Sequence, residues 1–512
     1  METTNNSGMG FSRRSFLKTM GAAAAFTIAP SSILGKSVSG QNAPSDMVNV
    51  CGIGIGSQGG SDIRNIATPD EEIGRGVGYP NTSHHGQYAG LAPKRQGPRM
   101  SDQVNQLGAA AEKKTFKYAN IYALCDVDTE YAGHMFAGYP KAKQYTDWHD
   151  VMDNKEIDAV VIGTPDHNHA IIAANAMLSG KHVFVEKPMA KSIYECRYLT
   201  KLAEKTGKVT QMGNQGHNIE GTYQTIEWIK AGLIGDVTEV HMWSNRPMWR
   251  QGYFDRPAPE AVPANLNYDL WLGPAAMKSY HSETTHFNWR GLWDYGTGAM
   301  GDMGAHTFDA PILALELGIP TKIQATTTPF NKEYIPQSEL VKYYFPARGK
   351  KPAVEVTWSD GGIKPFRPDE LEPGRALREC LYVGKKGMMQ HGTHGASPEL
   401  VPEKPGFKEP AKTMKRHSSV YIDFIESIQG GHKANNDFKI AAKLTEIMLL
   451  TNIAVLSQQM NMTLQYDPAK MKITNLPEAN QFLHYEYRNG WELPQMQQIL
   501  PVRQTETGWE LI

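Results

Sequence analysis

Three glycines near the start of the chain have a spacing that suits phosphate binding. Gly54, Gly56 and Gly59 form a Gly-x-Gly-x-x-Gly motif directly after the apolar run 47–53, where a strand would pass into a helix. In that context the first glycine permits a tight turn, the second lets the backbone approach a pyrophosphate, and the third allows close helix packing. A chain with 48 glycines can form such a turn by chance, so a second signal is needed.

The second signal is an acidic residue at the end of the next predicted strand. Residues 119–125 form an apolar run that ends at Asp126. A carboxylate there accepts hydrogen bonds from both ribose hydroxyls and repels a 2′-phosphate, so we expect NAD rather than NADP. The alternative is that Asp126 caps a helix. Because the acid usually follows the glycines by about 20 residues, we interpret residues 66–114 as an insertion, either a lid or an oligomer contact.

The segments around these residues alternate between strands and helices. Apolar runs at 157–163, 182–186 and 209–213 predict strands, and 170–178 and 193–202 predict helices between them. This alternation is typical of a doubly wound parallel sheet, which places the fold in the α/β class. Ligands of such sheets bind at the carboxyl ends of the strands.

The predicted strand ends carry polar segments. They read Thr-Pro-Asp-His-Asn-His at 164–169, Glu-Lys-Pro at 186–188 and Asn-Gln-Gly-His at 214–217. His167 and His169 are residues of a metal-binding type, but no third ligand has a suitable spacing. The sequence therefore predicts contacts at the edge of a cofactor and no metal.

Taken in order, these motifs resemble those of the Gfo/Idh/MocA oxidoreductase family, which includes glucose-fructose oxidoreductase and inositol dehydrogenase. The resemblance also rests on Asp-Leu-Trp-Leu-Gly-Pro at 269–274 and Gly-Ala-Met-Gly-Asp-Met-Gly-Ala-His at 298–306, and it covers roughly residues 47–460. It implies an N-terminal Rossmann domain and a C-terminal α+β domain with a large, mostly antiparallel open sheet. It also implies NAD(P)-dependent hydride transfer at a sugar, glycoside or polyol carbon.

The resemblance further implies that Lys187, Asp302 and His306 meet at the nicotinamide as catalytic residues. Oxidation of a carbinol needs hydride transfer and removal of the hydroxyl proton. Partial burial beside a cationic ring is expected to lower the pKa of Lys187, so that it accepts or relays the proton while His306 shares the hydroxyl as base. On a helix, Asp302 and His306 would face one side, where Asp302 orients His306 or binds a sugar hydroxyl. The alternatives are a surface lysine and a buried core histidine.

Two predicted sites follow from the motifs and the resemblance together. The cofactor site consists of Gly54, Gly56, Ser57, Gln58, Gly59, Asp126, Thr164, Pro165, His169, Glu186, Lys187, Asn214 and Gln215. The substrate site consists of Lys187, His217, Arg246, Trp289, Arg290, Asp302 and His306. Aromatic faces stack on the C–H faces of sugars and polar side chains bind the hydroxyls. Most neighbouring tryptophans are expected in the sheet core or the domain interface instead.

The hydrophobic period changes after residue 216. Alternating patterns at 237–243, 321–327, 340–344 and 354–358 predict an open, largely antiparallel sheet. Its free face is expected to serve substrate or a second subunit, giving a homodimer or homotetramer. The predicted domains are the Rossmann domain 46–216, the α+β domain 217–416, helices returning to the Rossmann domain at 417–460 and a C-terminal arm at 461–512.

The first forty residues resemble a twin-arginine export signal. Arg13 and Arg14 precede Phe16 and Leu17, and a mildly apolar run interrupted by Pro30 follows. The sequence thus predicts a signal peptide at 1–40, export of the folded protein by the twin-arginine machinery, and a periplasmic location. The alternative is an amphipathic helix. No stable membrane span is expected once the signal is removed, since residues 440–456 contain charges and are typical of a soluble helix.

The amino-acid composition excludes further classes of protein. A net charge of −1 argues against a nucleic-acid binder, and four scattered cysteines are too few for a disulfide framework. The leading hypothesis is an exported, NAD-dependent sugar or polyol oxidoreductase that holds its nicotinamide tightly. One alternative is a redox-neutral NAD-dependent glycosidase or lyase acting through a 3-keto sugar, against which the Glu-Lys-Pro lysine argues. The other is a carbohydrate-binding scaffold with a vestigial nucleotide fold.

Overall fold

A computed structural model describes residues 47–67, 119–252, 254–430, 432–460 and 462–512 of the chain. The predicted export signal and nearly all of the predicted insertion at 66–114 lie outside these residues. Within the described part, no helix combines the length and apolar character needed to cross a bilayer. The four cysteines are buried and form no disulfide bond.

The first sheet is parallel and has six strands in the order β3-β2-β1-β4-β5-β6. All four residues of β4 are buried, because helices cover both faces of the sheet. The sheet confirms the predicted Rossmann fold. Its elements are β1 (Val48–Ile53), α2 (Gln58–Ile66), β2 (Ala119–Cys125), α4 (Gly133–Gly138), β3 (Lys143–Tyr145), α5 (Trp148–Asp153), β4 (Ala159–Ile162), α6 (Asp166–Leu178), β5 (His182–Glu186), α7 (Ile193–Thr206) and β6 (Thr210–Gly213).

The second sheet has nine strands in the order β13-β12-β11-β7-β10-β9-β8-β14-β15. Only β7 and β10 pair in parallel, so the predicted, mostly antiparallel sheet is confirmed. Buried and more exposed residues alternate along β9, which is the pattern of a sheet with one covered face. The strands are β7 (Val237–Trp243), β8 (Lys322–Thr327), β9 (Glu339–Phe345), β10 (Val354–Ser359), β11 (Cys380–Gly384), β12 (Gly387–His391), β13 (Glu399–Val401), β14 (Leu464–Asp467) and β15 (Lys472–Ile473).

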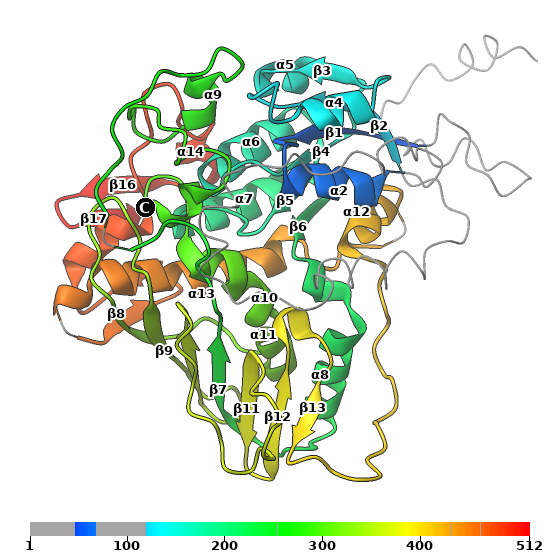
Figure 1. Ribbon diagram of the computed structural model, residues 1–512, viewed down its shortest axis with the longest axis vertical. Helices are drawn as coiled ribbons and strands as arrows, with labels where there is room; N and C mark the ends of the chain where they lie inside the picture. The colour runs from blue at the N-terminus through cyan, green and yellow to red at the C-terminus, as the bar shows by residue number, and fades with distance from the viewer. Residues whose placement is uncertain (1–46, 68–118, 253, 431, 461) are drawn as a thin grey trace, which may run out of the picture. The chain divides into compact units, whose positions relative to one another are not determined.

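Short helices connect the two sheets, and α8, α10 and α11 lie beside the second one (Figure 1). A π-helical turn at Met300–Gly304 leads directly into α10. The helices of this region are α8 (Glu220–Lys230), α9 (Tyr268–Leu272), α10 (Ala305–Thr307), α11 (Asp309–Leu315), α12 (Val420–Ile428) and α13 (Phe438–Leu456).

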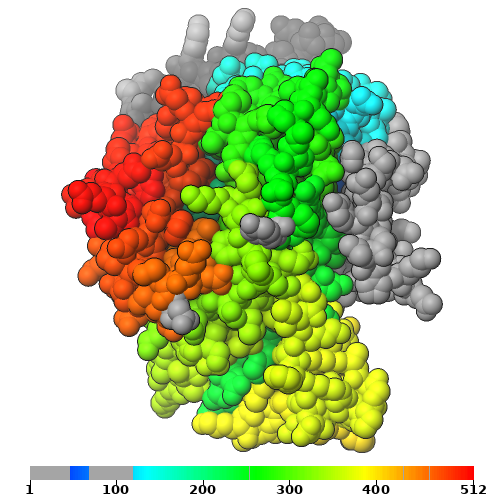
Figure 2. Space-filling model, turned by 60° about the vertical axis from the view of Figure 1, so that its left-hand side comes forward, coloured from blue at the N-terminus to red at the C-terminus, as the bar shows by residue number. Residues whose placement is uncertain are grey.

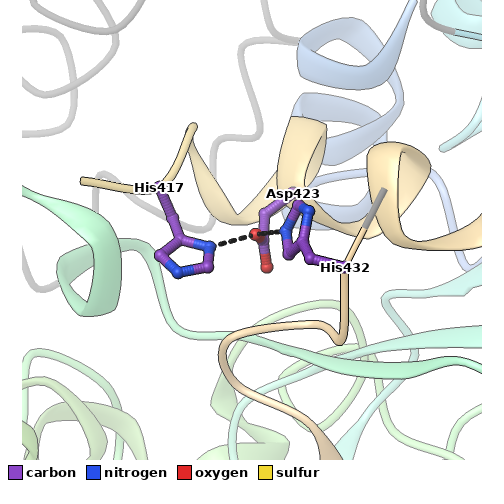
Figure 3. Close-up of side chains that lie close together, drawn as sticks. All are labelled: His417, Asp423 and His432. Carbon is purple, nitrogen blue, oxygen red and sulfur yellow. Dashed lines mark hydrogen bonds and ion pairs between the residues drawn. The ribbon is translucent and has the colours of Figure 1, made fainter. Parts of the chain in front are cut away.

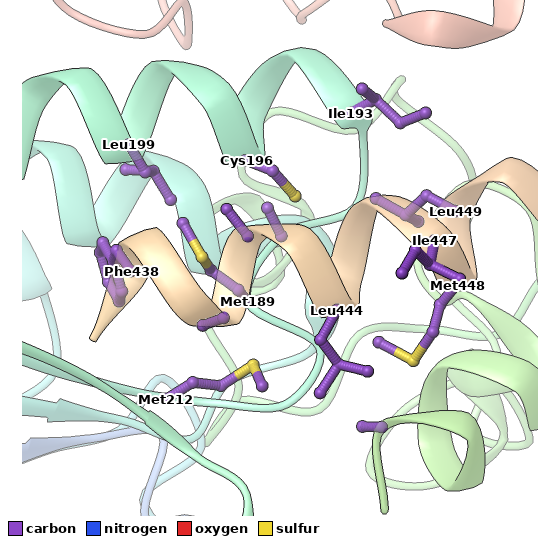
Figure 4. Packing of buried hydrophobic residues seen from close by; sticks show 14 of the residues in the cluster. Met189, Ile193, Cys196, Leu199, Met212, Phe438, Leu444, Ile447, Met448 and Leu449 are labelled. Carbon is purple, nitrogen blue, oxygen red and sulfur yellow. The ribbon is translucent and has the colours of Figure 1, made fainter. Parts of the chain in front are cut away.

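Helix α13 packs on elements of both sheets. It contacts α7 and β6 of the Rossmann domain and β8 of the second sheet. Figure 4 shows Cys196 and Leu199 of α7 in one cluster with Phe438 and Leu449 of α13. Asp437 caps the helix by accepting the Ile440 N–H. Burial of a leucine or phenylalanine side chain in this cluster stabilises the fold by about 1.5–3 kcal/mol. Because α13 packs on both sheets, it holds them together.

The C-terminal segment packs against both domains of its own chain. The hydroxyl groups of Tyr485 and Tyr487 both donate hydrogen bonds to Glu195 of α7. Arg488 forms an ion pair with Asp269 of the second domain. Figure 2 shows this segment, orange to red, alongside the green residues of the second domain. Besides β14 and β15 it contains α14 (Met496–Ile499), β16 (Val502–Thr505) and β17 (Gly508–Leu511).

Candidate active site

The glycine motif forms the turn between β1 and α2. Gly54 has a φ of +77°, and a Cβ there would lie 2.7 Å from the Thr164 backbone nitrogen. A Cβ on Gly59 would lie 2.2 Å from the Gly54 carbonyl oxygen, which explains the close helix packing. Gly56 has a different neighbour from the one expected, because the ring of Tyr131 lies 2.1 Å from its missing Cβ. The second glycine of the motif therefore accommodates an aromatic ring of this chain.

Asp126 ends β2 and lies beside this turn. One carboxylate oxygen accepts the N–H groups of Ile55 at 2.8 Å and Gly56 at 3.1 Å. Burial raises the pKa of Asp126 to about 6. The side chain does not cap α4, whose N-cap position is Ala132. The alternative of a helix cap therefore does not apply, and the carboxylate instead binds backbone N–H groups of the glycine turn.

The turn fits a dinucleotide by its own geometry. The glycine cradle has no room for side chains at Gly54 or Gly59, and it leads into the amino end of α2. The neighbouring Thr164 hydroxyl is buried without a hydrogen-bond partner in the described structure. An unsatisfied polar group of this kind is costly unless a ligand completes it. The residues present therefore match the chemistry of a bound pyrophosphate and ribose.

Lys187, at the carboxyl end of β5, is held by Asp302. Its Nζ lies 2.8 Å from Asp302 Oδ1 and donates a second hydrogen bond to the Asp302 carbonyl at 2.9 Å. Arg246 and Arg290 each place a guanidinium nitrogen 3.7 Å from the same carboxylate. The structure thus brings together four of the predicted substrate residues, around one nearly buried carboxylate.

The charge balance of this cluster favours an ionised Asp302. Burial alone raises the pKa of its carboxyl, but the positive charges of Lys187, Arg290 and Arg246 outweigh burial and hold the pKa well below its usual range. Arg290 is itself positioned over the Trp289 ring, with 4.3 Å between the guanidinium carbon and the ring centroid. Trp289 therefore acts on the site by supporting Arg290.

Asp302 does not contact His306 as expected for two residues on one face of an α-helix. Asp302 lies in a π-helical turn, and Lys187 holds its carboxylate. Instead, His306 Nδ1 lies 2.7 Å from the Asn214 side-chain oxygen. Asn214 in turn donates its amide N–H to the Ala305 carbonyl at 2.9 Å, which fixes its orientation.

These contacts define the tautomer of His306. Because Asn214 presents an oxygen, Nδ1 of His306 carries the proton and Nε2 carries the lone pair. Nε2 has no hydrogen-bond partner within the described part of the chain. Burial lowers the pKa of His306 well below its ordinary value, and His394 and Lys187 lower it further. The ring is therefore a neutral imidazole with a free proton acceptor.

Sequence reasoning missed His394. Its ring stacks on His306 with a centroid distance of 3.8 Å, and burial lowers its pKa to about 4. The residue lies in a turn after β12 with a φ of +63°. Its only sequence signal is the glycines at 392 and 395 on either side of it, which indicate a turn but no chemistry.

Two of the predicted site histidines have other partners. His169 contacts the carbonyls of Thr164 and Pro188, each at 2.8 Å, so both ring nitrogens are taken. His217 Nδ1 contacts the Asp309 carboxylate at 2.9 Å and its Nε2 contacts the Asn435 carbonyl at 3.1 Å. The structure therefore does not bring a free His217 nitrogen to the Lys187 cluster.

A pair of acidic residues, Glu186 and Asp62, lies near Lys187. Glu186 accepts a hydrogen bond from Gln215 at 2.9 Å, and Asp62 of α2 accepts one from Tyr421 at 3.1 Å. The other Asp62 oxygen is buried without a partner in the described residues. Burial raises the pKa of both carboxyls, and the nearby Asp62 raises that of Glu186 further. The pair therefore retains a proton to higher pH than ordinary carboxyls do.

This pair predicts a pH-dependent stability. Carboxyls with raised pKa values bind more protons in the folded than in the unfolded state, so the free energy of unfolding falls as pH rises from about 5 to about 8. Asp62→Asn should remove part of that slope and stabilise the protein by about 1–3 kcal/mol at the upper pH. Urea unfolding across this range measures it, with the exposed Glu370→Gln as control. An unchanged slope in Asp62→Asn contradicts the assignment.

Comparisons with known proteins agree with this geometry. Residues 98–214 match a family model described as oxidoreductase family, NAD-binding Rossmann fold, and residues 228–347 match the C-terminal α/β domain of the same family. These are the two domains of Gfo/Idh/MocA oxidoreductases. The first Gfo/Idh/MocA match begins beyond the glycine motif, but β1 pairs directly with β2 and β4 and places the motif in the same NAD-binding sheet.

Individual relatives match smaller parts of this chain. An inositol 2-dehydrogenase of Salmonella paratyphi B is 32% identical over 146 residues, which are 28% of this chain and 41% of the relative. A glycosyl hydrolase family 109 protein of Shewanella pealeana is 33% identical over 126 residues, 23% of this chain and 28% of that protein. The matches thus span less than half of either relative.

A solved structure confirms the fold over a longer stretch. The WlbA dehydrogenase from Bordetella pertussis, in complex with NADH and UDP-GlcNAcA, aligns with 82% of this chain and 99% of its own, with a TM-score of 0.52 and 14% identity. At this identity the likeness establishes the two-domain architecture.

Proposed function

We propose that the protein is an exported, NAD-dependent oxidoreductase that transfers hydride between a hydroxyl-bearing carbon of a sugar, glycoside or polyol and a tightly bound nicotinamide. The observation that carries the proposal is the ion pair of Lys187 and Asp302 together with the neutral His306, whose pKa the charge of Lys187 helps to lower. Together they provide a lysine at the end of β5, an ionised carboxylate and a neutral imidazole with a free Nε2. This is the set of groups that alcohol oxidation requires.

Each residue has a separate task in this reaction. His306 Nε2 accepts the proton of the substrate hydroxyl, and Asn214 keeps the ring in the tautomer that can do so. Lys187 donates a hydrogen bond to the oxygen of the reacting carbon. Arg246 and Arg290 are placed to bind the neighbouring hydroxyls. NAD, bound at the glycine turn, supplies the hydride acceptor.

Two lines support the substrate class. The names of the relatives refer to inositol and to a glycoside, and the NADH-bound structure of the same fold also holds a nucleotide sugar. In this chain, two arginines and a carboxylate offer several donors and acceptors within one site. Polyhydroxylated substrates require such a set of hydrogen-bonding partners.

Export, a periplasmic location and tight cofactor binding belong to the same proposal. The Arg13-Arg14 motif motivates export in the folded state, and free dinucleotide is scarce outside the cytoplasm. We therefore expect the purified protein to release NAD on denaturation. A mass spectrum of the released nucleotide tests this, and a protein that neither carries nor binds NAD contradicts it. A homodimer or homotetramer through the open sheet is part of the proposal, to be measured by light scattering.

The second candidate is the redox-neutral glycosidase or lyase. The similarity to a family 109 glycosyl hydrolase favours it, and Lys187 favours ordinary dehydrogenation. The two reactions differ in their products. Dehydrogenation leaves reduced nicotinamide in proportion to substrate oxidised, whereas the redox-neutral reaction cleaves a glycoside with no net reduction. Chromatography of the products, together with nicotinamide absorbance, separates them.

Asp126 should determine the cofactor preference. Asp126→Ala removes the carboxylate that repels a 2′-phosphate and binds ribose hydroxyls, so NAD affinity should fall by about 10- to 100-fold and the preference over NADP should shrink. Fluorescence titration of nucleotide-stripped protein with each cofactor measures both, and the exposed Asp369→Ala is the control. An unchanged ratio of the two affinities would exclude Asp126 from the ribose site.

A further inference from the structure

A cluster of two histidines and one aspartate lies at the start of α12, outside the cofactor and substrate residues. His417 precedes the helix, Asp423 lies on it and His432 follows it. His417 Nδ1 lies 2.8 Å from Asp423 Oδ1, and His432 Nε2 contacts the same oxygen. Figure 3 shows both rings pointing toward that carboxylate from opposite sides. All of the possible ligand atoms lie within 4.8 Å of one another.

The surrounding structure orients the carboxylate that the two histidines share. The second oxygen of the fully buried Asp423 accepts the Asn435 N–H at 2.7 Å and the Gln211 amide at 3.4 Å. These bonds orient the carboxylate so that Oδ1 faces the histidines. A carboxylate held by outer hydrogen bonds in this way is typical of metal sites.

A pocket gives access to the cluster. It has a volume of about 460 Å³ and is lined by both histidines together with Lys415, Ser418, Glu426 and Gln429. Arg416 also lines it, but Glu220 at 2.8 Å and Glu227 at 2.7 Å balance its charge. The pocket provides an entry path and room for solvent ligands, both of which a metal site with three protein ligands needs.

We propose that His417 Nδ1, His432 Nε2 and Asp423 Oδ1 bind a divalent transition metal ion, with Zn²⁺ as the best match. Imidazole nitrogens select Zn²⁺ and its neighbours over Ca²⁺ and Mg²⁺, which prefer oxygen ligands. Solvent in the pocket completes the coordination. The ion replaces the direct contacts between the rings and the carboxylate.

The position of the cluster gives the ion a structural role. The Asn435 carbonyl contacts His217, and the next carbonyl, of Asn436, accepts the Met212 N–H of β6 at 3.0 Å. The strand β6 leads to Asn214, which holds His306. A metal that joins His417 and His432 to α12 therefore braces the segment against which this strand end rests, without contact to the substrate residues.

The test uses the full chain, stripped with a chelator and titrated with Zn²⁺ alone. Calorimetry and metal analysis should detect one Zn²⁺ site in the wild type. The affinity of that site should fall by about 100-fold or more in His432→Ala and in His417→Ala. His149→Ala, which removes an exposed histidine paired with Asp147, should keep it. Co²⁺ in place of Zn²⁺ should show absorption bands of a nitrogen- and oxygen-bound ion, and Ca²⁺ should not compete.

Both outcomes are decisive. The site is supported if the wild type binds one Zn²⁺ per chain and the two cluster variants do not. It is further supported if the zinc-free wild type unfolds at a lower temperature than the zinc-bound wild type. Absence of Zn²⁺ binding in the wild type, or the same stoichiometry and affinity in His417→Ala and His432→Ala as in the wild type, overturns it. Circular dichroism of the two variants confirms that they are folded.

Discussion

Lys187→Met is expected to reduce turnover of the physiological sugar or polyol by about 1000-fold while NAD remains bound. The substitution keeps the length of the side chain but removes the ammonium that donates to the substrate oxygen. Groups that move or hold a proton in the transition state contribute about 100- to 10,000-fold. Asp302 still has Arg246 and Arg290 beside it, so the carboxylate does not become an isolated buried charge and the fold should persist.

The measurement is the single-turnover rate of nicotinamide reduction in protein loaded with NAD. Lys201→Met, which replaces an exposed lysine on α7, is the matched control and should retain the wild-type rate. Equal rates in Lys187→Met and wild type would remove Lys187 from the reaction. Such a result would favour the alternative hypothesis of a carbohydrate-binding scaffold.

His306→Asn is expected to reduce the same rate by about 100- to 10,000-fold. The asparagine amide can replace Nδ1–H as the donor to Asn214, but it offers nothing in place of Nε2. The variant thus removes the proton acceptor and keeps the contact that orients the segment. His149→Asn, a substitution of an exposed histidine, is the control.

The pH profile distinguishes a base from a merely structural histidine. The pKa of His306 is lowered well below its ordinary value, so the wild-type ring is neutral at neutral pH and is protonated only on strong acidification. The wild-type rate should therefore stay level as pH falls through the range in which an ordinary histidine titrates, and decline only on stronger acidification. His306→Asn should lack this acidic decline. A variant with a normal rate, or with the same acidic decline, would assign the decline to another group.

The parallel sheet was predictable because its strands are buried on both faces and are followed by recognisable turns. The short strand β3 was missed, since Lys143–Tyr145 are largely exposed and have no apolar run. Strands β11 to β13 were also missed. Their segments contain glycines and histidines, and their pairing with β7 is a long-range contact that no local pattern encodes.

The candidate site was predictable only in part. The sequence predicted Lys187, Asp302, His306 and the two arginines as site residues. The structure places Lys187 and the two arginines around the carboxylate of Asp302. The relation between Asp302 and His306 could not be read from the spacing, because each side chain is held by a partner that is distant in sequence, Lys187 for Asp302 and Asn214 for His306. His394 reaches His306 from a turn of the second domain, which only the tertiary fold brings there.

The most direct test of the central claim is the reduction of protein-bound NAD by a panel of sugars, glycosides and polyols, followed at the absorbance of reduced nicotinamide. The account predicts that at least one compound reduces the bound cofactor in a single turnover, and that Lys187→Met loaded with NAD does not respond to it. Absence of reduction by every member of the panel, or glycoside cleavage with no reduced nicotinamide at completion, would contradict it.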